Sequence, residues 1–444
     1  MPKVVIVTND WSGLGLGLLM IYQGSDVVFA FDMKDVEPKD REAMETLGNG
    51  LVKKMPLAEA TRQLLMQKTL WVFDSNNLSK TADKLREAGE LVIGTSAISE
   101  KLENDRDYAA GIAEAVGLKL PETEKFTDYP AALKFLERNR NKAYVYKPYK
   151  SDPTATFVPQ EANDPKLANE ELREYIGGLT AKGKPQFILQ RMVEGIEVDF
   201  DLWLRDGKPK MAFCDLESKR KLTGDLGENI GCAGGVVFRV PLTCPGIVDT
   251  VGKYLKWKDL AHYTGSVDVN VMYTSEGILF LENCFRFGYN AYPAIFQSLA
   301  TDKAERILRD WVAGRTTIWH DFSDKYAASL TLVSDHPATG CPILVPDSFP
   351  EFFYLYRGYC EASRLKMVEG WPEIGCVTAT SKTVDDAALK CLKLTEFVTF
   401  PNKGYRTDLA ETYLPTLPAS RYYALARLGT FGPVADKHQG PEHS

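Results

Sequence analysis

Short apolar strands that alternate with helical segments are the feature of the first part of the chain that most restricts its fold. The runs KVVIVTND, VVFAFD and LWVFDS combine β-branched or aromatic residues with turn formers at their ends, and LVIGTS at 91–96 repeats this form. Segments between them, such as LAEATRQLLMQK, have apolar residues at helical spacing. This alternation predicts an α/β unit with a parallel sheet over residues 1–100.

A different pattern begins after residue 100. The segment KLENDRDYAAGIAEAVG predicts one helix that ends at Gly117. Strand-like runs then follow one another closely, and because several are hairpin neighbours we predict an α+β region with antiparallel pairing. These runs lie at 143–149, 186–193, 198–204, 209–217, 266–274 and 277–285.

The remaining segments complete the predicted organisation. The stretch at 151–166 is rich in Pro, Asp, Asn and Thr and predicts a loop. Strands that begin with YAASLTLVSD predict a third unit, of α/β type, over 319–432. The polar end of the chain, 433–444, predicts a disordered tail.

Composition narrows the class of partner. A net charge of -7 and a pI near 5.5 disfavour binding to a nucleic-acid backbone. No apolar run approaches the roughly 20 residues that span a bilayer, and a strand begins almost at once, so we expect neither a membrane span nor a signal sequence. The 8 cysteines include no C-x-x-C pair and the 5 histidines no metal or nucleophile motif. We expect a cytoplasmic protein with small-molecule partners, as a monomer or small homo-oligomer.

The segment GILFLENCFRFG at 277–288 predicts a strand that carries a metal-binding carboxylate. A tight turn joins it to SVDVNVMYT, and strand alternation puts Asp268 and Asn270 on one face of their strand and Glu282 and Cys284 on one face of the next. Two carboxylates facing each other between apolar strands repel unless a cation lies between them. Asp268 and Glu282 are therefore candidate magnesium ligands, with solvent-facing carboxylates as the alternative.

Three further features suit a bound nucleotide. Lys147 ends an apolar strand in YVYKP and suits a phosphate contact, unless it is a surface lysine. In QRMVEGIE the backbone of Val193 could pair with adenine and Glu197 could accept ribose hydroxyls, unless this is a turn with a solvated glutamate. In ESKRKLTGDLGENIGCAGG at 217–235, Lys219 suits a phosphate and the glycines let backbone N–H groups approach an anion, with a mobile surface loop as the alternative.

Taken in order, these features resemble the ATP-grasp superfamily, and within it the glycinamide ribonucleotide synthetase family over nearly the whole chain. That family's Asp-His-Lys-Arg, Gly-Asp and Gly-Pro-Asn-Thr-Gly-Gly-Met-Gly runs are similar to ESKR, TGD and GENIGCAG here. Its Glu-Phe-Asn-Ala-Arg-Phe-Gly run is similar to ENCFRFG, and its Tyr-Arg-x-Asp motif is matched by YRTD at 405–408. The offset from Gln190 to Glu197 resembles that of D-alanine–D-alanine ligase.

The resemblance implies a fold, a reaction and a set of site residues. It implies a pre-ATP-grasp domain over 1–100, a two-subdomain ATP-grasp domain over 101–318 and a C-terminal domain over 319–432. It implies that ATP, with Mg²⁺, phosphorylates a carboxylate and that an amine then displaces the phosphate to form an amide. By position it assigns nucleotide contacts to Arg106, Lys147, Gln190, Val193, Glu197 and Lys219, metal ligands to Asp268 and Glu282, catalytic roles to Lys219, Arg220 and Arg286, and substrate contacts to Glu217, Asn229 and Gly231.

Departures from the family pattern predict a changed substrate. NDWSGLGLGLLM replaces the glycine-rich run that holds phosphoribosylamine in the family, and YKSDPTATFVP replaces the glycine loop after Lys147. GYNAYP replaces Gly-Asp-Pro-Glu after Arg286, and Cys284, a poor ligand for a hard cation, replaces the asparagine ligand. We expect a carboxylate–amine ligase that joins an acid such as glycine to another amine. The alternatives are a non-catalytic nucleotide-binding paralogue and the orthodox family reaction of purine synthesis.

Overall fold

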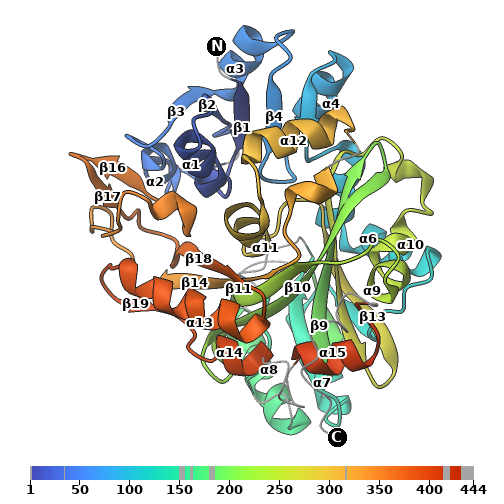
Figure 1. Cartoon of the computed structure of the whole chain (residues 1–444). Helices are drawn as coiled ribbons and strands as arrows, with labels where there is room; N and C mark the ends of the chain where they lie inside the picture. The colour runs from blue at the N-terminus through green and yellow to red at the C-terminus, as the bar shows by residue number, and fades with distance from the viewer. Residues whose placement is uncertain are drawn as a thin grey trace, which may run out of the picture.

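The computed structural model describes most of the chain (Figure 1). The predicted loop at 151–166 lies partly outside the described residues, and the predicted tail wholly outside them. Figure 1 shows an N-terminal unit at one end of the molecule, a long twisted sheet through its middle, and α7 and α8 at the other end. The described residues are 3–34, 36–149, 156–160, 164–179, 186–315, 318–413 and 421–431.

The N-terminal unit is a five-stranded parallel sheet with strand order β3-β2-β1-β4-β5, as the sequence predicts. β1 is buried along its whole length, which explains why VVIVT is a continuous apolar run rather than an alternating one. β3 was not predicted because its sequence, KKMP, carries two lysines. The strands are β1 (Val4–Thr8), β2 (Val27–Phe31), β3 (Lys53–Pro56), β4 (Leu70–Phe73) and β5 (Leu91–Ile93), and the helices are α1 (Leu14–Tyr22), α2 (Arg41–Thr46), α3 (Leu57–Leu64) and α4 (Ser79–Glu87).

The predicted single helix over 101–117 is wrong, because the chain breaks at Asp105. There α5 (Ala97–Asn104) ends and α6 (Arg106–Ala115) begins. Asp105 has an extended backbone, with φ -111° and ψ 95°, and its carboxylate accepts a hydrogen bond from Tyr108 N at 3.0 Å. It is therefore the N-cap of α6. The break sets Arg106 at the start of α6, where its Nε donates to Pro148 O at 2.9 Å.

A small antiparallel sheet follows, with strand order β6-β8-β7. Aromatic residues fill its core, and Phe187 stacks on Phe126 and Tyr129 with centroid separations of 5.6 and 5.4 Å. The strands are β6 (Thr123–Phe126), β7 (Tyr144–Pro148) and β8 (Phe187–Arg191), and the helices are α7 (Tyr129–Arg138) and α8 (Pro165–Leu179).

The central sheet has nine strands, in the order β13-β12-β9-β10-β11-β14-β18-β15, with β19 paired to β14. Its pairing is antiparallel, as predicted for the middle of the chain. The strands are β9 (Ile196–Arg205), β10 (Lys208–Leu222), β11 (Leu226–Arg239), β12 (Gly265–Thr274), β13 (Gly277–Cys284), β14 (Tyr326–Ser334), β15 (Phe353–Leu355), β18 (Glu373–Ser381) and β19 (Lys403–Gly404).

Two features of this sheet differ from the patterns in the sequence. The glycine-rich run at 217–235 is not a surface loop, because it forms the ends of β10 and β11 and the turn between them. Most of the C-terminal strands do not form a sheet of their own, because β14 pairs with β11 and brings β18, β15 and β19 into the central sheet, while β16 and β17 pair apart from it. The domain boundaries themselves stay predictions, but one sheet continues across the boundary at residue 319.

Several of the remaining elements pack against the central sheet, whereas α12 packs against β5 of the N-terminal unit. α13 (Val384–Leu394) lies along β14 and β18 (Figure 1). The aromatic segment at 349–360 is largely core, since Phe353, Tyr354 and Leu355 of β15 are buried. The other elements are α9 (Pro245–Asp249), α10 (Val251–Tyr254), α11 (Ala291–Pro293), α12 (Ala304–Ala313), β16 (Tyr359–Glu361), β17 (Arg364–Lys366), α14 (Leu409–Tyr413) and α15 (Arg421–Arg427).

Candidate active site

A large pocket lies between the small sheet and one face of the central sheet. β7 and β8 contribute Lys147 and Gln190, and the chain after β8 contributes Val193. β9 to β13 supply the opposite wall, and Arg106 enters from α6. Every site residue predicted from the sequence lines this one pocket. Besides the four residues just named, these are Glu197, Glu217, Lys219, Arg220, Asn229, Gly231, Asp268, Glu282 and Arg286. The structure thus brings them together, while their individual roles stay predictions.

The two predicted metal ligands lie on neighbouring strands and face the pocket. In the register of β12 and β13, Asp268 is opposite Cys284 and Asn270 is opposite Glu282, so all four share a face. Asn283 points to the other side, where its Nδ2 donates to Leu102 O at 3.2 Å. Strand alternation therefore gives the correct faces, and Asn283 cannot replace the ligand missing at Cys284.

Lys219 is the centre of an ionic network on this face. Its Nζ lies 2.6 Å from Glu197 Oε1, 3.7 Å from Glu282 Oε1 and 3.8 Å from Glu217 Oε2. Burial disfavours the charged amine, but these carboxylates outweigh it and raise the pKa of Lys219 well above its usual value. Burial likewise opposes the charge of Glu282, yet Lys219 and Lys147 lower the pKa of Glu282 to about 2. Both groups are therefore charged at neutral pH.

Lys147 and Arg106 add positive charge on the opposite side of the pocket. Burial lowers the pKa of Lys147 to about 8, although Glu282 acts in the other direction. The Nε of Arg106 donates a hydrogen bond to Pro148 O, which holds the guanidinium at the end of β7. With Lys219, these residues surround the carboxylate of Glu282 with cations.

Arg286 is held at the border between the pocket and the N-terminal unit. Its Nε lies 3.0 Å from Glu103 Oε1, and Phe285 N donates to the other oxygen of Glu103 at 2.8 Å. Its guanidinium also lies over the ring of Tyr289, 4.7 Å from the centroid. Glu103 was missed in the sequence because nothing in a helical glutamate reveals a partner so distant in the chain.

Arg220 lines the pocket, but its donors are directed to carbonyl groups. Its Nη1 donates to Gly227 O at 2.9 Å, and its Nη2 donates to Val158 O at 3.0 Å and Pro159 O at 2.7 Å. These contacts favour a role in holding the β10–β11 hairpin near residues 158–159. The catalytic role of Arg220 stays a prediction.

Asp199, Asp215 and Arg421 belong to the same region and were not predicted. Asp199 and Asp215 are directly paired across β9 and β10, on the face that carries Glu197, Glu217 and Lys219. Their spacing in VDFD and CDLE, charged at every second position of apolar strands, was the available signal. Arg421 lines the pocket and donates to Glu217 O at 2.6 Å, a contact that no local pattern reveals.

The donor set fits magnesium and the phosphates of a nucleotide. Asp268 Oδ1 is buried and has no hydrogen-bond partner among the described residues. Such oxygens are the ligands that a hard cation prefers. Cys284 contributes no anion here, because burial raises the pKa of its thiol well above the usual value.

The chain is similar to enzymes of purine biosynthesis in sequence and in fold. No protein-family model matches the chain. It is 22% identical over 360 residues to the bifunctional purine biosynthetic protein PUR2,5 of Pichia angusta, a match that spans 76% of this chain and 44% of that protein. The crystal structure of phosphoribosylamine–glycine ligase from Thermotoga maritima superimposes with a TM-score of 0.63 at 17% identity, over 91% of this chain and 99% of that one.

The chain has an ATP-grasp fold. This confirms the fold and the resemblance predicted from the motifs. A second structure with this fold, the biotin carboxylase domain of the Hydrogenobacter thermophilus 2-oxoglutarate carboxylase in complex with MgADP, ADP and bicarbonate, gives a TM-score of 0.58 at 12% identity, over 92% of each chain. The two solved structures are thus a phosphoribosylamine–glycine ligase and a biotin carboxylase domain, two enzymes of different name that share this fold. None of the helices among the described residues of this ATP-grasp chain combines the length and apolar character needed to cross a membrane.

Proposed function

We propose that the chain is an ATP-dependent carboxylate–amine ligase that forms an amide and releases ADP. The observation that carries this proposal is the set of cations around Glu282, which shares a face of the sheet with Asp268 in a pocket between two sheets. Phosphoryl transfer to a carboxylate depends on positioning and on neutralised charge more than on a proton-transfer residue. The pocket offers that chemistry, and ATP with Mg²⁺ is the cosubstrate that fits it.

Each group has a proposed role. Lys147, Arg106 and Lys219 bind the phosphates, and Arg286 faces the phosphoryl group that is transferred. Glu197 accepts the ribose hydroxyls once Lys219 turns from it to a phosphate. Val193 contacts adenine through its backbone, beside Gln190. Asp268 and Glu282 hold Mg²⁺, which when bound neutralises phosphate charge.

The carboxylate and amine are proposed to meet near Glu217, Asn229 and Gly231. Asn229 and Gly231 are on β11, close to where Tyr289 approaches from the strand end after Arg286. A Cβ at Gly231 would lie 3.3 Å from the Tyr289 ring, so the glycine keeps this part of the pocket open. The acid is proposed to be small, such as an amino acid.

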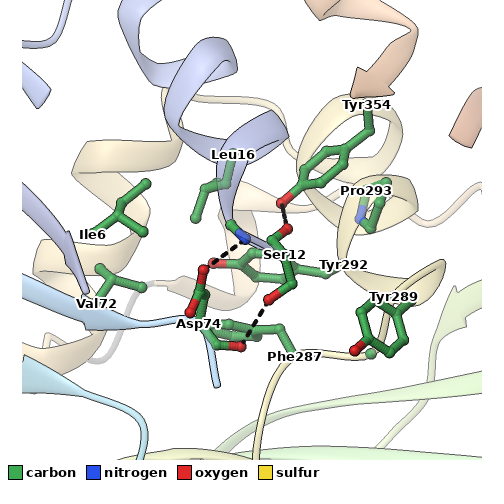
Figure 2. A pocket seen from close by; sticks show the side chains of 12 residues that line it. Ile6, Ser12, Leu16, Val72, Asp74, Phe287, Tyr289, Tyr292, Pro293 and Tyr354 are labelled. Carbon is green, nitrogen blue, oxygen red and sulfur yellow. Dashed lines mark hydrogen bonds between the residues drawn. The ribbon is translucent and has the colours of Figure 1, made fainter. Parts of the chain in front are cut away.

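The amine is proposed to differ from phosphoribosylamine. A small cavity lies under the segment that replaces the family's glycine-rich run, and Figure 2 shows Asp74 in its wall, accepting a hydrogen bond from Gly13 N at 2.9 Å. Burial, and then the charge of Asp10, raise the pKa of Asp74 well above its usual value. The described residues that line this cavity include no lysine or arginine to balance the charge of a phosphate, so we infer an acceptor that presents no phosphate here.

A non-catalytic nucleotide-binding protein is the second candidate, and Cys284 is the observation that favours it. The thiol stands opposite Asp268 in the register of β12 and β13, where an amide oxygen would help to complete the metal site. A hard cation gains little from a neutral thiol. The loss of this ligand weakens the case for turnover but leaves both carboxylates in place.

Release of ADP tests the proposal directly. Purified protein with MgATP would be mixed with small carboxylic acids and with amines, and ADP would be measured by a coupled assay. One acid and amine pair that gives ADP in a one-to-one ratio with amide, and none with Glu282→Gln, supports a ligase. The matched control is Glu276→Gln at the neighbouring turn, where the carboxylate is 59% exposed. ATP bound without ADP release for any pair would favour the second candidate.

A further inference from the structure

Three carboxylates lie together beneath the wall of the pocket that carries Lys219. Asp199 of β9 is directly opposite Asp215 of β10, and Glu217 is two residues further along the same face. One oxygen from each lies within 4.8 Å of the others. Their exposed fractions are 2%, 2% and 9%, so all three are buried. Asp199 and Asp215 do not line the nucleotide pocket, whereas Glu217 does, so the cluster lies directly beneath that wall of the pocket.

Several oxygens around the cluster lack a donor. Asp199 Oδ1 and Asp215 Oδ1 have no hydrogen-bond partner among the described residues. Asn270, which is neutral and lies opposite Asp199 on β12, has an unpartnered Oδ1 as well and is 4% exposed. Buried acceptors are nearly always hydrogen-bonded. Their grouping on one side of the sheet therefore indicates a bound group that supplies positive charge.

The packing around Asp215 also leaves room for its carboxylate. Gly235 of β11 is on the far side of Asp215, and a Cβ at that position would lie 3.0 Å from Asp215 Oδ1. A side chain there would push against the oxygen. The glycine thus leaves space for a carboxylate on a strand that is largely buried.

The neighbouring lysine does not balance this charge. Lys219 Nζ is 3.8 Å from Glu217, but its shorter contact, 2.6 Å, is to Glu197, and Glu282 competes at 3.7 Å. One ammonium is thus shared by three carboxylates before Asp199 and Asp215 are counted. Buried like charges are costly without a cation or bound protons.

We propose that Asp199, Asp215 and Glu217 bind a hard divalent cation, with the amide oxygen of Asn270 as a further ligand. Oxygen-only sites select Mg²⁺, Mn²⁺ or Ca²⁺ over softer metals. Oxygens on opposite sides of such an ion lie about 4.2 Å apart for Mg²⁺ and about 5 Å apart for Ca²⁺, twice the metal–oxygen distance. Because the three oxygens all lie within 4.8 Å of one another, they are close enough to contact one such ion. The site needs no nucleotide, and Glu217 would belong both to it and to the wall where the proposed function places the substrates.

Manganese binding to the metal-stripped full chain tests the site. Mn²⁺ would be titrated in the absence of nucleotide, and free Mn²⁺ followed by electron paramagnetic resonance. We expect one bound ion per chain, at least tenfold weaker binding in Asp199→Asn/Asp215→Asn, and less than a threefold change in Glu282→Gln. Mg²⁺ and Ca²⁺ should compete for the ion. With a non-hydrolysable ATP analogue, additional Mn²⁺ should bind to the wild type and to the double variant but not to Glu282→Gln.

The opposite results overturn the proposal. Failure of the wild type to bind Mn²⁺ without nucleotide would mean that a proton shared between Asp199 and Glu217 neutralises the cluster. If Glu282→Gln loses Mn²⁺ binding and the double variant keeps it, the ion belongs to the nucleotide pocket. Thermal unfolding separates binding from folding, because Mn²⁺ should raise the Tm of the wild type but not of the double variant. Should the double variant not fold, Asp215→Asn alone gives the same comparison.

Discussion

At the scale of single residues, Lys147 makes nucleotide binding depend on pH. Burial lowers its pKa to about 8, so its charge is lost between pH 7 and 9. If only the charged form binds phosphate, the Kd for ATP should rise about tenfold over this interval. Because the pKa in the folded state lies below that in the unfolded state, stability rises above pH 8 and unfolding does not explain the loss. Calorimetric titration at several pH values measures the effect.

The control for this pH dependence keeps the charge. Lys147→Arg carries a guanidinium that stays protonated up to pH 9, so its ATP affinity should change little with pH. A fall in affinity that is equal in the wild type and in Lys147→Arg would contradict the assignment to Lys147.

Cys284→Asn should improve the metal site. The substitution returns an amide oxygen to the position opposite Asp268, where the thiol is neutral. We expect the Mg²⁺ concentration required for half-maximal ATP binding to fall on the order of tenfold, the scale at which single groups tune metal affinity. Cys284→Ala, which adds no oxygen, should leave it unchanged. Equal behaviour of the two variants would show that the position contacts no metal.

How far sequence predicts single residues depends on where their partners lie. The alternation of one hairpin was enough to put Asp268 and Glu282 on a common face. The same argument applied to VDFD and CDLE would have found Asp199 and Asp215, but pairing β9 with β10 requires knowing the register of both strands. Glu103 and Arg421 reach the site from distant elements, and local patterns carry no information about them.

At the scale of elements, two helical glycines should respond in opposite ways to alanine. A Cβ at Gly15 of α1 would lie 2.3 Å from the Tyr354 ring, whereas one at Gly111 of α6 would meet nothing within 4 Å. We expect Gly15→Ala to destabilise the protein by about 1–3 kcal/mol through overpacking. Gly111→Ala should stabilise it by about 0.5–1 kcal/mol through helix propensity. Urea unfolding measures both, and stabilisation by Gly15→Ala would contradict the close packing.

Arg406 should anchor the turn of the β10–β11 hairpin. Its side chain is 1% exposed, lies 2.6 Å from Asp225 and 2.8 Å from Asp408, and donates to Arg220 O at 3.0 Å. Arg406→Ala leaves these groups unpaired, so we expect a loss of about 3 kcal/mol in the free energy of unfolding. The exposed Arg364→Ala is the control. A loss below 1 kcal/mol, measured by urea unfolding, would argue against an anchoring role.

Elements were predicted well where their pattern is local. The parallel strands of the N-terminal unit follow from alternation, and the middle hairpins follow from closely spaced strands. The break at Asp105 was missed because good helix formers continue through it, and only the N-cap hydrogen bond to Tyr108 reveals it. β3 was missed because KKMP does not have the composition typical of a strand. It forms one because it pairs with β2 at the edge of the sheet, where charged residues are tolerated.

At the scale of the whole molecule, the sequence could not reveal that one sheet joins the middle and the end of the chain. β11 and β14 pair although about ninety residues separate them, as the register of Val236 with Ala328 shows. YAASLTLVS has the pattern of a buried strand in any sheet, so its partner cannot be inferred from it. The continuous sheet connects the hairpin that lines the pocket to the C-terminal elements that hold Arg406.

Binding of ATP to the whole chain, measured by calorimetry with and without Mg²⁺, tests the central claim most directly because it requires no knowledge of the substrates. The account predicts Mg²⁺-dependent binding that weakens more than tenfold in Glu282→Gln and stays unchanged in Glu276→Gln. Absence of ATP binding by the folded wild type, or equal affinity in the wild type and Glu282→Gln, would contradict the proposal that this pocket is an ATP site.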